Sequence, residues 1–146
     1  MAKKHEDSVK GIISLFESAG YDMNIKILNS NDYNVPQTRK RVFYIGFRKD
    51  LNITNYEFPT PHEYKPTLKD AIWDLKDSVL PSLDKNRSNG DNCKVSNHEY
   101  YRGAYSSRYM KGNRVRSWDE PSFTIIARAG EAPQHPQAPK MEIYAK

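Results

Sequence analysis

Near the start of the chain, apolar residues recur at every third or fourth position, which is typical of a helix with one buried face. They are Val9, Ile12, Ile13, Phe16 and Ala19. Ser8 precedes them with the hydroxyl of a typical N-cap, and Gly20 follows where helices commonly end. The pattern predicts a helix that begins at Ser8 and ends before Gly20.

Two strands are predicted next. Over residues 21–29 apolar and polar residues alternate, which indicates a strand with one buried face. Residues 30–40 are polar and are expected to form a loop. The run Arg-Val-Phe-Tyr-Ile-Gly-Phe over residues 41–47 is typical of a strand buried on both faces. We expect the two strands to be antiparallel neighbours at the end of an α/β domain.

The pattern changes after a linker marked by Pro59, Pro61 and Pro66. Thr67 can cap a short helix in which Leu68, Ala71, Ile72 and Leu75 face one way. From residue 76 onward Pro, Asn, Ser and Gly become frequent and apolar runs shorten. Candidate strands lie at 113–118 and 122–127, and the proline-rich segment 132–139 is expected to be extended.

Composition narrows the class of protein. The 146 residues carry a net charge of +5, which favours an anionic partner such as nucleic acid. The single cysteine, Cys93, excludes a disulfide within these residues and a zinc site of paired cysteines, and it suits the cytoplasm. No stretch approaches the ~20 apolar residues of a membrane helix. We therefore expect a cytoplasmic protein without a membrane partner.

Basic residues gather in two places. Gln37, Arg39 and Arg41 alternate in an extended segment, so an amide and two guanidinium groups are expected to line one side, where they suit a phosphate, a carboxylate or a base carbonyl. Over residues 100–116, tyrosines are interleaved with basic residues, as in sites that follow a nucleic-acid backbone. From the residues alone, the first cluster is better explained as a solvated basic loop, and the second as a solvated β-face whose tyrosines pack a small core.

The remaining candidates carry weaker signals. Arg128 and Glu131 lie in a short loop that suits either base recognition or a plain turn. The histidines form no recognisable metal pattern and are each expected on the surface or in loops: His5, His62, His98 and His135. Cys93 is expected to be an incidental thiol whose pKa the adjacent Lys94 could lower slightly.

Together these segments resemble the cytosine-5 DNA methyltransferases of bacterial restriction–modification systems, most closely the GGCC-methylating members. The most specific match is residues 29–48, which look like the family's Gln-x-Arg-x-Arg motif with both flanking strands. Further matches lie at 72–77, 113–118, 120–124 and 135–139.

The resemblance implies a chemistry. In the family, the target cytosine is flipped out of duplex DNA, a cysteine thiolate adds to C6, and C5 takes a methyl group from S-adenosylmethionine. By resemblance, Arg41 would hold the O2 edge of the flipped base and Arg39 would meet a phosphate or the closing catalytic loop. Gln37 would brace neighbouring polar groups.

The same resemblance implies a DNA-reading surface. Arg114 and Arg116 fall where family members contact guanine or phosphate, and Thr124 matches the start of the recognition-loop element. Where the GGCC enzymes place guanine-contacting arginines, this chain has Gly112 and Gly130, with Lys111 and Arg128 nearby. This departure argues against GGCC as the target.

Other family elements have no counterpart in these residues: the Phe-x-Gly-x-Gly cofactor motif, the Pro-Cys nucleophile, the Glu-Asn-Val region and the final helix. We therefore expect the chain to bind no cofactor and to be inactive alone, as the product of truncation or excision, or as one half of a split enzyme. In a split enzyme, a separate polypeptide carrying the cofactor-binding and nucleophile half would cover the strand 41–47.

The expected fold class is an α/β portion, with terminal helix, antiparallel hairpin and linker helix, over residues 1–75, followed by a small, irregular, mostly β recognition domain over 76–146. An exposed sheet edge would permit self-association. Two alternatives stay open: a stand-alone, sequence-preferring DNA-binding module, and an unrelated basic structural protein.

Overall fold

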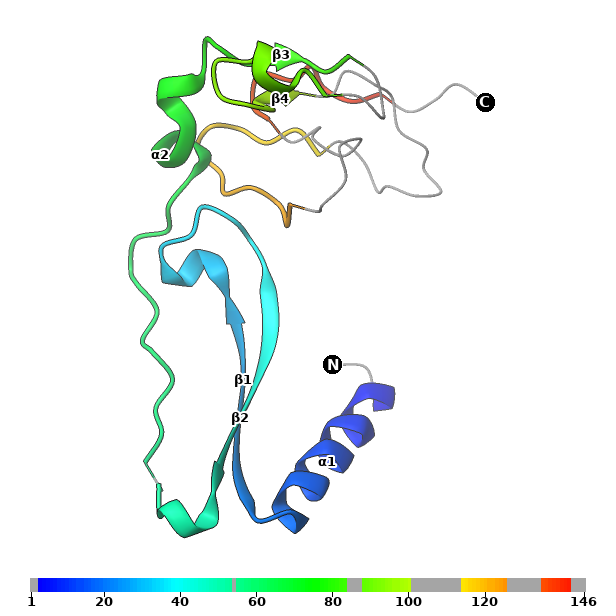
Figure 1. Ribbon diagram of the computed structural model, residues 1–146, viewed down its shortest axis with the longest axis vertical. Coiled ribbons are helices and arrows are strands. Elements are labelled where there is room, and N and C mark those ends of the chain that lie inside the picture. Colours follow the sequence, from blue (N-terminus) through cyan, green and yellow to red (C-terminus); the bar gives the residue numbers. More distant parts are fainter. Residues whose placement is uncertain (1–2, 54, 84–87, 101–113, 126–134, 143–146) are drawn as a thin grey trace. The chain divides into compact units, whose positions relative to one another are not determined.

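The computed structural model describes residues 3–53, 55–83, 88–100, 114–125 and 135–142. The chain divides into two compact units (Figure 1). The first comprises Met1–Asn29 and Lys40–Pro61, and the second comprises Ser30–Arg39 and His62–Lys146. The second unit therefore takes in the loop between the first unit's two strands.

The first unit opens with helix α1, Lys3–Ser18. It begins ahead of Ser8, so the predicted N-cap at Ser8 is wrong: this serine lies inside the helix. The charged residues before Ser8 can continue a helix, and the Glu6 carboxylate lies 3.2 Å from the Lys10 ammonium across one turn. Gly20 follows the helix at φ +87°, which confirms its predicted role.

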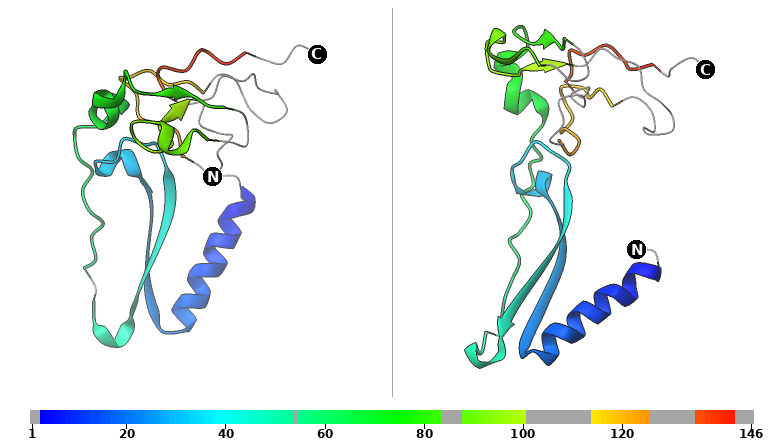
Figure 2. Two further views of the ribbon diagram at one scale, coloured as in Figure 1. Left: turned by 45° about the horizontal axis from the view of Figure 1, so that its top comes forward. Right: turned by 45° about the vertical axis from the view of Figure 1, so that its right-hand side comes forward.

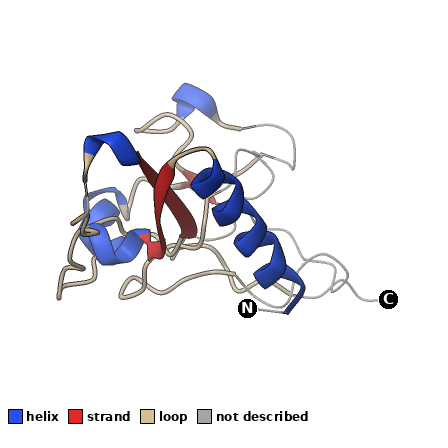
Figure 3. Cartoon of the chain, turned by 90° about the horizontal axis from the view of Figure 1, so that it is seen from below, coloured by secondary structure: helices blue, strands red, loops and turns tan. Residues whose placement is uncertain are grey.

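Strands β1 (Tyr21–Asn29) and β2 (Lys40–Arg48) form the predicted antiparallel hairpin, with Tyr21 opposite Arg48 at one end and Asn29 opposite Lys40 at the other. Figures 1 and 3 show α1 beside this hairpin. At their junction, the rings of Phe16 and Tyr21 meet edge to face with centroids 6.1 Å apart.

The predicted burial of the hairpin is wrong for this chain. On β2, which was expected to be buried on both faces, Phe43 is 45% exposed, and on β1 Ile27 is 48% exposed. A two-stranded ribbon with one helix beside it lacks the second layer that buries a sheet. Further apolar side chains of the hairpin and α1 are also exposed: Leu15, Phe16, Val42 and Tyr44.

Aromatic contacts attach the linker to the hairpin within the first unit. The Tyr56 ring lies 5.3 Å from Phe47 of β2 and 5.0 Å from Phe58, measured between centroids. The Lys26 ammonium of β1 lies 5.6 Å from the centroid of Phe58. The extended linker is therefore packed against the hairpin at this point.

In the second unit, α2 spans Leu68–Ile72 and Thr67 forms the predicted cap. Asp70 accepts hydrogen bonds from the Tyr64 hydroxyl (2.6 Å) and the Thr67 backbone N–H (2.7 Å), which lower its pKa to about 2. Leu68 is buried, whereas Ala71 is exposed, so the predicted common face does not include Ala71.

The short strands β3 (Leu80–Pro81) and β4 (Glu99–Tyr100) pair in parallel, and neither was predicted (Figure 2). A strand was predicted over residues 113–118, but the described residues 114–118 contain no strand. Of 122–127, the described residues contain one bridge residue, Ser122. The segment 135–139 is not extended as predicted, because the Ala138 N–H donates to the His135 carbonyl in a turn.

The apolar core of the described residues lies in the second unit and is small: Leu68, Cys93, Ala138 and Met141. Buried polar residues accompany it: Asn31, Glu99 and Ser122. Glu99 accepts hydrogen bonds from the backbone and side-chain nitrogens of Asn89, both at 2.7 Å. Hydrogen bonds made by buried polar groups therefore supplement the small apolar core of this unit.

Candidate functional site

The loop that carries Gln37 and Arg39 is closed on itself by hydrogen bonds. The Ser30 N–H donates to the Arg39 carbonyl (3.1 Å) and the Ser30 hydroxyl donates to the Gln37 carbonyl. The Val35 N–H donates to the Ser30 carbonyl (3.3 Å), and Asn34 takes the left-handed conformation at φ +66°. We call residues 36–39 the base-holding loop, because they lead into Arg41, which the resemblance predicts to hold the flipped base.

The short 3-10 helix Ser30–Tyr33 anchors this loop in the second unit. The buried Asn31 amide donates to the carbonyls of Val35 (3.1 Å) and Pro66 (2.8 Å). Asp32 accepts the His62 N–H through its carbonyl and pairs with the Lys65 ammonium at 2.9 Å through its carboxylate. The 3-10 helix is thereby tied to the segment that precedes α2.

A second segment, residues 122–124, runs parallel to the base-holding loop. The Ser122 N–H donates to the Pro36 carbonyl (2.9 Å), and the Thr38 N–H donates to the Ser122 carbonyl (2.8 Å). The Thr124 hydroxyl donates to the Thr38 carbonyl at 3.1 Å. The loop that carries Gln37 and Arg39 and the segment that carries Thr124 therefore meet in one unit.

The predicted row Gln37, Arg39 and Arg41 is divided between the units. Gln37 and Arg39 are half-buried members of the second unit, whereas Arg41 lies on β2 of the first unit and is exposed. One Arg41 guanidinium nitrogen donates to the Lys40 carbonyl at 2.8 Å. The common side expected for the three side chains stays a prediction.

The predicted DNA-reading residues differ in their surroundings. Arg114 and Thr124 are half-buried, while Lys111 and Arg128, with Gly112 and Gly130, lie outside the described residues. Arg116 is held within the chain: its guanidinium carbon lies 3.5 Å from the centroid of Phe123, and it pairs with Glu120 at 3.1 Å.

Several residues of this site were missed from sequence. Asn31, Ser122 and Phe123 act through partners that are distant in sequence or through backbone pairing, for which the sequence carries no local signal. Glu120 did carry a signal, because an opposite charge four residues from Arg116 often forms a pair.

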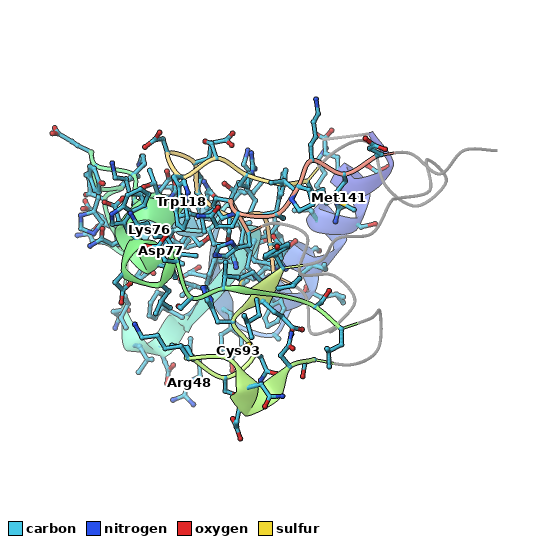
Figure 4. The ribbon with its side chains drawn as sticks, turned by 90° about the horizontal axis from the view of Figure 1, so that it is seen from above. Arg48, Lys76, Asp77, Cys93, Trp118 and Met141 are labelled. Carbon is cyan, nitrogen blue, oxygen red and sulfur yellow. The ribbon has the colours of Figure 1, made fainter. Side chains whose placement is uncertain are left out.

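Two of the histidines, predicted in loops or on the surface, are partly buried. The rings of His98 and His135 meet at 5.0 Å, and Trp118 lies 5.6 Å from His135 and 5.1 Å from Trp73. The Lys76 ammonium lies 4.4 Å from the Trp73 centroid, so Lys76 and Trp118, both labelled in Figure 4, each contact the Trp73 ring. Burial, followed by the nearby His98, lowers the pKa of His135 to about 4.

Cys93 is buried, and burial followed by the charge of Glu99 raises the pKa of its thiol. The predicted lowering by Lys94 is therefore wrong. Within the described ranges, no three His, Cys, Asp or Glu side chains gather as metal ligands. Among the helices of the same ranges, none has the length and apolar character needed to cross a bilayer.

Comparison with known proteins gives the family. The family model for C-5 cytosine-specific DNA methylases matches residues 1–145. The chain is 54% identical over 143 residues to the type II methyltransferase M.FnuDI of Fusobacterium nucleatum, and 54% identical over 141 residues to M.MthTI of Methanothermobacter thermautotrophicus. In both cases 97% of this chain aligns.

A third relative, M.NgoPII of Neisseria gonorrhoeae, is 46% identical over 148 residues, covering 99% of this chain. The chain spans 42% of the length of each of these three relatives. An unrelated basic structural protein is thereby excluded. With a family match over nearly its whole length, the chain belongs to the C-5 cytosine-specific DNA methylases.

Proposed function

We propose that this chain is the portion of a DNA cytosine-5 methyltransferase that holds the flipped cytosine and reads the surrounding sequence. The observation that carries the proposal is the pairing of Pro36 and Thr38 with Ser122 and Thr124. It joins the Gln-x-Arg-x-Arg motif to the segment that resembles the family's recognition element. Double-stranded DNA is the proposed partner, in keeping with the net charge of +5.

In this proposal Arg41 holds the O2 edge of the displaced base. Its side chain is exposed, and a guanidinium has five N–H donors, of which the contact to Lys40 uses one. A guanidinium that holds O2 stabilises negative charge as it develops on the ring, which favours reaction at C5. Arg39 serves a phosphate or the closing catalytic loop, and Gln37 braces the polar groups around them.

The DNA-reading role falls to the basic residues of the second half and to Thr124. Arg114 is half-buried and is proposed to contact guanine or phosphate. Lys111 and Arg128 are proposed to lie at the DNA beside the positions where Gly112 and Gly130 replace arginines, so the target differs from GGCC. The recognition domain is proposed to span residues 76–146, and residues 1–75 belong to the catalytic domain.

The complete enzyme uses S-adenosylmethionine as methyl donor. The 146 residues contain no glycine-rich loop of the kind that cradles such a cofactor, so we assign no step to it within this chain. The exposed apolar side chains of β2 suit contact with the cofactor-binding and nucleophile portion, on the same or a separate polypeptide. Without that portion we expect no methyl transfer, and the open hairpin edge would permit self-association.

Fluorescence anisotropy of the purified chain on a labelled duplex oligonucleotide, between about 50 and 200 mM salt, tests the DNA-binding role. We expect affinity to fall steeply with salt. Replacing Arg114 with Gln should reduce the dependence of log K on log salt by about one. Arg48→Gln removes the same charge at the far end of β2, where Arg48 pairs with Asp50, and should leave binding nearly unchanged.

The alternative function, a DNA-binding module without catalysis, makes a different prediction. It requires sequence preference to persist at physiological salt with the chain alone. Loss of preference without the catalytic portion favours the methyltransferase proposal. A folded chain that fails to bind DNA, with and without that portion, contradicts both.

A further inference from the structure

We propose that Arg116 is a positioning residue that sets the segment 122–124 against the base-holding loop, rather than a DNA contact. The inference rests on the proposed function, in which that loop leads into Arg41, the residue that holds the cytosine. The resemblance to the family had grouped Arg116 with Arg114 as residues that contact DNA. The evidence is the set of contacts that the Arg116 guanidinium makes inside the second unit.

The guanidinium is already engaged on two sides. Its carbon lies 3.5 Å from the centroid of the Phe123 ring, a stacked arrangement in which the ring face attracts the cation. One terminal nitrogen pairs with the Glu120 carboxylate at 3.1 Å, and the side chain is only 20% exposed. Its Nε is buried and has no hydrogen-bond partner among the described residues.

Glu120 extends this arrangement to the neighbouring turn. Its carboxylate accepts the Ser117 N–H at 2.9 Å, and this bond, together with the charge of Arg116, lowers the pKa of Glu120. The carbonyl of Glu120 accepts the Leu68 N–H from the first turn of α2. The Arg116–Glu120 pair is therefore fixed to α2 as well as to Phe123.

Phe123 lies between the two residues that hold the base-holding loop. Ser122, immediately before it, exchanges backbone hydrogen bonds with Pro36 and Thr38, and Thr124, immediately after it, binds the Thr38 carbonyl. A guanidinium stacked on Phe123 fixes this stretch of backbone. Releasing it would let the segment shift, and the contacts to the base-holding loop would weaken.

Amide hydrogen exchange followed by NMR on the full chain tests the inference without DNA. We expect Arg116→Gln and Glu120→Gln to speed exchange at the Thr38 and Ser122 amides by roughly fivefold or more, with Arg116→Lys closer to wild type. The Leu80 and Ser82 amides bond across β3 and β4 in the same unit and should exchange at wild-type rates. A general loss of stability would accelerate all four.

The salt dependence of duplex DNA binding separates positioning from contact. Arg116→Gln should lower the affinity for DNA without changing the dependence of log K on log salt. Glu120→Gln should also lower the affinity, although removing a negative charge would by itself favour binding to DNA. A slope lowered by about one in Arg116→Gln would show a phosphate contact and overturn the proposal. Unchanged exchange at Thr38 and Ser122 in both variants would overturn it independently.

These readouts separate failure of the proposed function from failure of this inference. If the wild-type chain binds no DNA while the Thr38 and Ser122 amides still respond to Arg116→Gln, the positioning role stands and the DNA role falls. If DNA binds but those amides do not respond, the positioning role falls alone.

Discussion

The hydroxyl of Thr124 donates a hydrogen bond to the carbonyl oxygen of Thr38, which lies 86 residues earlier in the chain. Thr38 is the residue between Gln37 and Arg39 of the base-holding loop, and its N–H donates to Ser122 two residues before Thr124. The loop and the segment 122–124 are thus held by backbone and side-chain bonds together. Thr124, which matches the family's recognition element, therefore also holds the base-holding loop through its hydrogen bond to Thr38.

Replacing Thr124 with Val should cost about 1 kcal/mol of unfolding free energy, because the shape is kept and one hydrogen bond is lost. Urea denaturation of the chain measures the change. Thr60→Val alters an exposed linker threonine in the same way and should cost less. Equal stabilities for Thr124→Val and wild type would show that the bond to Thr38 contributes nothing.

Asn31→Ala should destabilise the second unit by about 1–3 kcal/mol, since the carbonyls of Val35 and Pro66 lose the buried amide that binds both. Denaturant unfolding with probes in each unit gives the size and the place of the effect. Asn55→Ala, at an exposed position, is the matched control. If Asn31→Ala and Asn55→Ala are equally stable, the buried Asn31 amide does not stabilise the second unit.

His135 should make stability depend on pH. Its pKa is about 4 in the folded chain and 6.5 ordinarily, so between these values the unfolded chain binds more protons. The contribution of His135 to the free energy of unfolding is therefore complete above about pH 6.5 and is lost as the pH falls toward 4. Unfolding free energies measured at several pH values should show a smaller slope across this window for His135→Phe than for wild type.

The control for this prediction is His62→Gln, which removes an exposed histidine that has no ring contact with His135 among those described. That variant should keep the wild-type slope. A slope that survives unchanged in His135→Phe would show that the pH dependence does not come from His135.

Local patterns carried most of what the sequence predicted correctly. Alternation predicted the bounds of β1, and Thr67 ahead of a short apolar pattern predicted the cap of α2, because both depend on neighbours within a few residues. Gly20 ended α1 for the same kind of reason. Ser8 misled because a serine that can cap a helix can equally lie inside one whose start is set by earlier residues.

Long-range pairing explains the rest. Ser122 was predicted inside a strand of its own, yet it pairs with Gln37, a partner that alternation cannot identify. The apolar run of β2 predicted a strand correctly but not its exposure, because burial depends on what covers the hairpin. His98 and His135 are in ring contact although they lie 37 positions apart in the sequence, and no sequence motif indicates this contact.

Methyl transfer reconstituted from two polypeptides is the most direct test of the central proposal. This chain would be mixed with the part of the Fusobacterium nucleatum relative that it does not span, and the transfer of labelled methyl from S-adenosylmethionine to duplex DNA would be measured. We predict methylation only when both polypeptides are present, reduced at least about 100-fold by Arg41→Gln and little changed by Arg48→Gln. Methylation by the 146 residues alone, equal rates for the two variants, or no transfer from a mixture that forms a folded complex would contradict the account.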